Sequence, residues 1–287
     1  MKFLYALAAL LIIGGLAYQF AALEIFNAVM PKDAGSRLIK SNVPFGTDDR
    51  QKLDIYGPSQ GEGPWPVIVF YYGGSWNSGN RQSYAFAGRA LAAEGFLVIV
   101  PDYRLHPQDP FPRFIVDTAA ALDWAIGSAG VYGGDQRNVF AVGHSAGAYN
   151  LALAVLDKSY LAELGTDVSA LRGIATLSGP FDFLPLDTKV SIDTFGMVPD
   201  LATTQPVNYA RADAPPFLLL HGSADTTVRQ RNAQSLYEKL KAAGADVTLK
   251  IYPGIGHVGM MTAFAKPLRS SVSSLADVVA FFKARVK

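Results

Sequence analysis

The chain has 287 residues, of which 50% are hydrophobic and 17% are charged, a composition sufficient for a large core with strands buried on both faces. Its 25 basic and 24 acidic residues leave a net charge of +1, which gives no field to attract nucleic acid and argues against such partners. The absence of cysteine excludes disulfides, thiolate metal sites and a cysteine nucleophile, and it fits an exported protein as well as a cytosolic one.

The start of the chain is strongly apolar. Phe3 to Leu23 carries no charged side chain over 21 residues, which is long enough to span a bilayer. We expect residues 1–30 to be an uncleaved membrane anchor, because the apolar run is longer than a typical signal core and continues past Ala17. The alternative is a signal peptide with Lys2 as its basic region and cleavage after Ala17, giving a periplasmic or secreted protein. A buried helix of the globular unit is the less favoured interpretation.

Residues 31–50 are polar and mixed in composition, and we expect them to form a tether. Residues 51–56 alternate polar and apolar side chains, which is typical of a half-buried edge strand. Apolar runs then alternate with segments of helical composition. The further strands are predicted at 66–72, 96–100, 138–142, 173–178, 217–222 and 246–252. The helices are predicted at 81–94, 113–127, 148–156, 231–243 and 270–287.

This alternation predicts an α/β fold, with a mostly parallel central sheet and helices on both faces, in a single domain at 51–287. Residues 179–216 interrupt the pattern and lack clear periodicity. They either form a short cap that contributes an apolar lining to a site or pack onto the core. The side chains concerned are Phe181, Phe183, Leu184, Phe195 and Met197.

The pentapeptide Gly143-His144-Ser145-Ala146-Gly147 stands between an apolar run and an alanine- and leucine-rich segment. This order predicts a strand, a sharp turn and a helix, with Ser145 at the turn. Small neighbours are needed there because the backbone is strained and the helix passes close to the strand, and glycine has no Cβ to clash. The pattern is typical of a nucleophile elbow, although a glycine-rich turn without chemistry is the structural alternative.

A serine hydroxyl needs a base to take its proton, and four histidines are available. His257 lies in a glycine-rich loop after the final predicted strand, and we expect it to be the base. His144 is expected to point elsewhere, and His221 to be a packed or hydrogen-bonded side chain. His106 lies in a proline-rich loop near the site.

The base in turn needs an acid that fixes its tautomer. Asp225 follows the strand at 217–222 and precedes His257, which gives the order serine, acid, histidine typical of this elbow. Asp182, after the strand at 173–178, is the competing acid.

An acyl-transfer intermediate carries an oxyanion, which needs backbone N–H donors. We expect these donors from Ala146, at the start of the helix after the serine, and from Gly74 and Ser75, after a central strand. No phosphate-binding loop and no His, Asp or Glu cluster with metal-ligand spacing occurs, so neither a cofactor nor a metal is expected.

Five motifs occur in the order found in one large fold family. They are Tyr72-Gly73-Gly74-Ser75-Trp76, Asp102-Tyr103-Arg104-Leu105, the pentapeptide at 143–147, His221-Gly222-Ser223-Ala224-Asp225 and Gly256-His257. From about residue 51 to the end, the chain resembles the α/β-hydrolase fold, in particular carboxylesterases of the hormone-sensitive-lipase-like, feruloyl-esterase and arylformamidase types. The resemblance implies Ser145 as nucleophile, Asp225 as acid and His257 as base. Relatives usually begin the oxyanion loop with histidine, where this chain has Tyr72.

The leading hypothesis is a serine carboxylesterase acting on a small-molecule ester. An amide-type hydrolase such as an arylformamidase, using the same three residues, is the alternative within enzymes. A membrane-tethered binding protein without catalysis is the alternative from another class. The sequence leaves the oligomeric state open.

Overall fold

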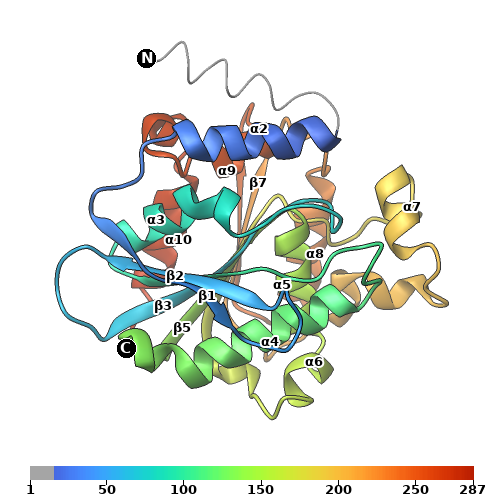
Figure 1. Cartoon of the computed structure of the whole chain (residues 1–287). Helices are drawn as coiled ribbons and strands as arrows, with labels where there is room; N and C mark the ends of the chain where they lie inside the picture. Colours follow the sequence, from blue (N-terminus) through green and yellow to red (C-terminus); the bar gives the residue numbers. More distant parts are fainter. Residues whose placement is uncertain (1–15) are drawn as a thin grey trace.

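The computed structural model describes residues 16–287, with side chains from Ala22 onward, and its centre is an eight-stranded sheet (Figure 1). The strand order is β1-β2-β4-β3-β5-β6-β7-β8, and the six strands from β4 to β8 in this order run parallel to one another, whereas β2 is antiparallel to β4. The predicted α/β class is therefore confirmed. The strands are β1 (Ser36–Pro44), β2 (Lys52–Pro58), β3 (Trp65–Tyr71), β4 (Leu97–Pro101), β5 (Gly134–His144), β6 (Leu171–Leu177), β7 (Phe217–Gly222) and β8 (Val247–Tyr252).

Helices cover both faces of this sheet. The α-helices are α2 (Leu16–Val29), α3 (Ala85–Ala93), α4 (Arg113–Ser128), α5 (Ala146–Leu156), α6 (Ser159–Ala162), α7 (Lys189–Phe195), α8 (Arg231–Ala243), α9 (His257–Thr262) and α10 (Ser274–Lys283). Short 3-10 helices lie at Gln82–Tyr84, Ala129–Tyr132, Val168–Ala170, Leu201–Thr204, Pro206–Tyr209 and Lys266–Ser271. Helices α3 and α10 pack on one face, and α4 packs with α5 on the other.

The central strands are fully buried because helices cover them from both sides. In β3 and β4 the side chains from Val67 to Tyr71 and from Leu97 to Val100 have no solvent exposure. Their β-branched and aromatic residues suit a strand packed on both faces. Because these strands run parallel, their carboxyl ends lie at the same end of the sheet, where loops can bring side chains from distant parts of the chain together.

The predicted tether at 31–50 differs from the structure. Residues 36–44 form β1, which pairs antiparallel with β2 and makes the outer edge of the sheet. The prediction of residues 51–56 as an edge strand is also wrong, because β2 lies between β1 and β4 and is buried along almost all its length. Strand β1 was missed because an edge strand faces solvent on one side, and its polar composition is therefore similar to that of a tether.

Helix α2 packs on the globular unit through one face (Figure 1). Ala22, Phe26 and Met30 are buried, and the Phe26 ring meets the Phe86 ring edge to face at 5.2 Å. The Asn27 side chain donates to the carbonyl of Gln82 at 2.9 Å and accepts from the backbone N–H of Phe86 at 3.1 Å. The interpretation as a buried helix, which the sequence favoured least, therefore holds for residues 22–30. The predicted anchor residues 1–15 lie outside the described residues.

Within residues 16–287, one helical stretch, Arg113–Tyr132, is long and apolar enough to cross a membrane. It packs against α5 and β5 in the globular unit, as a core helix does, and half of it is buried.

The segment at 179–216 packs largely onto the core. Phe181 and Phe195 are fully buried, and the Phe195 ring lies 4.8 Å from the Trp76 ring. Met197 is 93% exposed and lines nothing, contrary to its predicted role. Helix α7, within this segment, stands at the right-hand end of the molecule in Figure 1.

We predict that Phe26→Ala lowers the free energy of unfolding by about 3 kcal/mol, because it leaves a cavity between α2 and α3. Urea unfolding gives the value. Ile25→Ala is the matched control, since Ile25 is 51% exposed on the same helix and its truncation should change stability by less than about 0.5 kcal/mol. Equal midpoints for Phe26→Ala and the wild type would contradict the packing of α2.

Candidate active site

Ser145 occupies a sharp turn between β5 and α5. Its backbone has φ 53° and ψ −123°, a conformation that residues other than glycine rarely adopt. A Cβ on Gly143 would lie 2.6 Å from the carbonyl oxygen of Gly147, and a Cβ on Gly147 would lie 2.3 Å from that of Tyr72. Both glycines are therefore required by close backbone approach, as the elbow pattern predicts.

The structure brings Ser145, His257 and Asp225 together in one hydrogen-bonded chain. Nε2 of His257 lies 2.9 Å from the hydroxyl of Ser145, and its Nδ1 lies 2.8 Å from Oδ2 of Asp225. The three residues follow β5, β8 and β7, three parallel strands whose carboxyl ends share one edge of the sheet. A ring held between a carboxylate and a hydroxyl in this way can accept the hydroxyl proton.

Asp225 is held as an anion. Its side chain is fully buried and accepts hydrogen bonds from the backbone N–H groups of Thr227 at 3.0 Å and Val228 at 2.8 Å. Burial alone would raise the pKa of Asp225, but hydrogen bonds from His221 and His257 outweigh it and hold the pKa well below its usual range. The competing acid, Asp182, accepts instead from the Ser235 hydroxyl.

Two other histidines lie beside this group. The prediction that His144 points elsewhere is wrong, because its ring lies 4.9 Å from that of His257 and its Nε2 is 3.3 Å from the His257 carbonyl. Burial, together with the nearby His257, lowers the pKa of His144 to about 3, which keeps it neutral. His221 is fully buried, with Nε2 2.8 Å from the carbonyl of Val228, as predicted for a hydrogen-bonded side chain.

The loop after β3 approaches the serine closely. Gly74 and Ser75 have φ of 148° and 52°, which turns the backbone inward. Within residues 16–287, the backbone N–H groups of Ser75 and Ala146 donate to no protein acceptor, and both residues border the same cavity as Ser145. The residues predicted as oxyanion donors are thus brought to one place, with Gly74 next to Ser75.

His106, predicted near the site, lies under the same loop. Its backbone N–H donates to the carbonyl of Trp76 at 2.9 Å and so fixes the far end of the loop.

Tyr72, at the start of this loop, braces the loop through its hydroxyl. The hydroxyl donates to Oδ1 of Asp102 at 2.7 Å and accepts from Nη2 of Arg50 at 3.0 Å. Burial, together with Asp102, raises the pKa of Tyr72 well above its usual value, so the donor proton is retained. Arg50 also donates to the carbonyl of Gly79 at 2.9 Å, at the other end of the loop.

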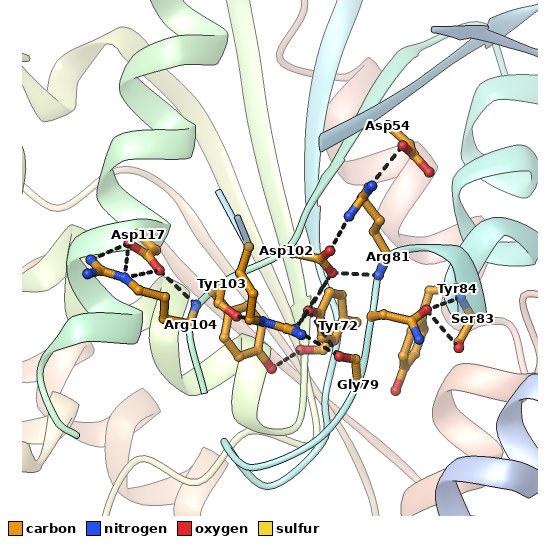
Figure 2. Close-up of polar contacts among 12 residues, drawn as sticks. Asp54, Tyr72, Gly79, Arg81, Ser83, Tyr84, Asp102, Tyr103, Arg104 and Asp117 are labelled. Carbon is orange, nitrogen blue, oxygen red and sulfur yellow. Dashed lines mark hydrogen bonds and ion pairs between the residues drawn. The ribbon is translucent and has the colours of Figure 1, made fainter. Parts of the chain in front are cut away.

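Asp102 is the centre of a buried ionic network (Figure 2). The Arg81 guanidinium pairs with Oδ2 of Asp102 and, at 2.9 Å, with Asp54, while the Arg81 backbone N–H donates to Asp102 at 2.7 Å. Two carboxylates and two guanidinium groups therefore compensate one another beneath the loop. The sequence signal was the Asp102-Tyr103-Arg104 motif. The partners Asp54, Arg50 and Arg81 gave no signal of their own.

Two cavities adjoin Ser145. The larger, of about 400 Å³, is bounded by the loop at 75–76, part of the 179–216 segment and the start of α8. Phe183 is the one member of the predicted apolar lining that borders it. The smaller, of about 130 Å³, is bounded by Leu23 of α2, by α9 and by the glycine loop. In the described part of the chain, no group of three or more His, Asp or Glu side chains is arranged to hold a metal ion.

The sheet order and this arrangement of serine, acid and histidine define the α/β-hydrolase class. The chain belongs to the BD-FAE family, whose model matches residues 53–240. Esterase LipC of Mycobacterium tuberculosis is 33% identical in an alignment 243 residues long that covers 76% of this chain and 59% of LipC. The isoprenylcysteine alpha-carbonyl methylesterase ICME of Arabidopsis thaliana is 27% identical in an alignment 265 residues long that covers 84% of this chain and 61% of that protein.

The chain thus spans about three fifths of the length of these curated relatives. Among solved structures, esterase B from Lactobacillus rhamnosis superposes with a TM-score of 0.81 at 23% identity, covering 93% of this chain and 91% of that one. At this identity the likeness establishes the fold.

We predict that Tyr72→Phe lowers the free energy of unfolding by about 1–3 kcal/mol, because it removes a donor from the buried Asp102 and an acceptor from Arg50. Tyr132→Phe is the control, since the Tyr132 hydroxyl makes no hydrogen bond within residues 16–287. Denaturant unfolding of both variants measures the difference. A Tyr72→Phe protein as stable as Tyr132→Phe would show that the hydroxyl does not brace the loop.

Proposed function

We propose that the protein is a carboxylic ester hydrolase that forms an acyl-enzyme on Ser145. The observation that carries the proposal is the continuous hydrogen-bonded chain from the Ser145 hydroxyl through His257 to Asp225. Membership of the BD-FAE family and the esterase names of the curated relatives support ester hydrolysis. The intact chain of hydrogen bonds argues against a binding protein that has lost catalysis.

In the proposed reaction, His257 takes the hydroxyl proton as Ser145 Oγ attacks the ester carbonyl carbon. Ionised Asp225 stabilises the imidazolium that forms. The backbone N–H groups of Ser75 and Ala146, with that of Gly74 beside them, stabilise the oxyanion, and the amino end of α5 adds its dipole. The intermediate collapses as His257 gives the proton to the departing alcohol oxygen. A water molecule then repeats the sequence and releases the acid.

An N-formyl amide could react by the same steps. The relatives are named as esterases and methylesterases, which favours the ester as substrate. Rates measured on an aryl ester and on an N-formyl aromatic amide distinguish the two.

We predict that Ser145→Ala lowers kcat on short-chain aryl esters by on the order of 10⁴-fold or more while the protein stays folded. A fluorophosphonate probe should label the wild type at Ser145 and leave the variant unlabelled. Undiminished hydrolysis by the Ser145→Ala protein would contradict the proposed function. Ser271→Ala provides a control, because Ser271 is exposed, its hydroxyl donates to the carbonyl of Leu268, and it lines neither cavity beside Ser145.

We further propose that the apolar residues 3–23 anchor the protein to a membrane without cleavage. The support is the uncharged length of this run. Cleavage after Ala17, the exported alternative, would leave the packed residues from Ala22 onward in place.

We predict that the protein purified from its native host retains the residues before Tyr18 and stays in the membrane fraction after a high-pH carbonate wash. A chain that starts at Tyr18 is the control and should be released by the wash, because it lacks most of the apolar run. A mature N-terminus at Tyr18 in the native protein would contradict the anchor.

A further inference from the structure

The two cavities beside Ser145 differ in size, lining and distance from the base. We propose that the smaller cavity, closed by Leu23 of helix α2, receives the alcohol part of the ester and the larger receives the acyl part. The protein would then prefer esters that join a large acid to a small apolar alcohol. This inference rests on the proposed function, since it assigns the two halves of the same substrate.

The base decides which cavity holds the alcohol. In the tetrahedral intermediate, the alcohol oxygen must lie within hydrogen-bond reach of the imidazolium that protonates it. Nε2 of His257 is 2.9 Å from Ser145 Oγ, and His257 lines the smaller cavity and not the larger. The larger cavity, which Ser145 and the oxyanion donors Ser75 and Ala146 also line, is then left for the acyl part.

Size and chemistry separate the two cavities further. The alcohol cavity measures about 130 Å³ against about 400 Å³ for the acyl cavity. Leu23, Phe86, Val258 and Met261 give it apolar side chains. Hydroxyl side chains such as Ser78 and Thr262 also line it, but no Asp, Glu, Lys or Arg among the described residues does. The acyl cavity differs in having charged side chains in its lining, which are Asp187, Arg229 and Arg231.

Helix α2 makes this wall a fixed one. Phe86 both lines the alcohol cavity and carries the edge-to-face contact with Phe26 of α2. The two hydrogen bonds of the Asn27 side chain hold the helix beside the start of α3. Leu23 is therefore placed against the cavity by the same contacts that dock the helix, and it sets the size of the alcohol.

A pair of isomeric esters tests the assignment. Ethyl octanoate and octyl acetate have the same atoms, so they differ only in which side of the ester is long. We expect kcat/KM for ethyl octanoate to exceed that for octyl acetate by about tenfold or more, because each methylene that a pocket rejects costs roughly a factor of ten. Equal values, or a preference for octyl acetate, would overturn the inference.

Substitutions at Leu23 test the wall itself. Leu23→Ala should lower the ethyl octanoate to octyl acetate ratio by about fivefold or more, and Leu23→Trp should raise it, because they widen and narrow the same cavity. Opposite shifts cannot come from a general loosening of α2. Val190→Ala, in the acyl cavity, should change the dependence on acid length and leave the dependence on alcohol length as it is.

Ile25→Ala serves as the matched control on the same helix, since Ile25 is exposed and lines neither cavity, and it should leave the ratio unchanged. If the wild type is active and the ratio is unchanged in both Leu23 variants, the role of Leu23 is overturned while the proposed function stands. A wild type that hydrolyses neither ester and takes no fluorophosphonate label would overturn the proposed function and this inference together.

Discussion

The hydrogen bond between Ser145 and His257 depends on a backbone conformation that serine rarely adopts. At φ 53°, Ser145 stands at the top of β5 with its hydroxyl 2.9 Å from the imidazole. The strain is offset by packing that only glycine permits at 143 and 147, and by the Ser145 N–H bond to the Leu177 carbonyl at 2.9 Å. The cost of holding the nucleophile is thus distributed over three neighbouring strands rather than over the loop alone.

The loop that faces the nucleophile depends on charges buried below it. Asp102 is buried, and an unpaired carboxylate there would be strongly destabilising. Arg81 compensates it from one side, while the Tyr72 hydroxyl and Arg50 connect it to both ends of the glycine loop. Tyr72 thus supplies what the loop needs from this position, which is a buried donor to Asp102.

Local sequence patterns predicted individual strands and helices and the order of the site residues. The strand at 217–222 and the helix at 231–243 match β7 and α8 to the residue, and the order of Ser145, Asp225 and His257 predicted which side chains meet. Features set by contacts between distant residues gave no such signal. Strand β1 buries few of its side chains, and the Arg50 bond to Tyr72 joins residues 22 apart in sequence through tertiary packing alone.

The N-terminal helix shows why composition alone could not decide its role. A membrane and a protein core select the same apolar residues, but a core contacts only one face of a helix. Ala22, Phe26 and Met30 recur every four residues and are buried, whereas Ile25 and Val29 face outward. The packed face leads directly to Leu23 at the edge of the smaller cavity. One face of this helix therefore serves the protein core and also supplies a side chain beside Ser145, a role that composition alone does not reveal.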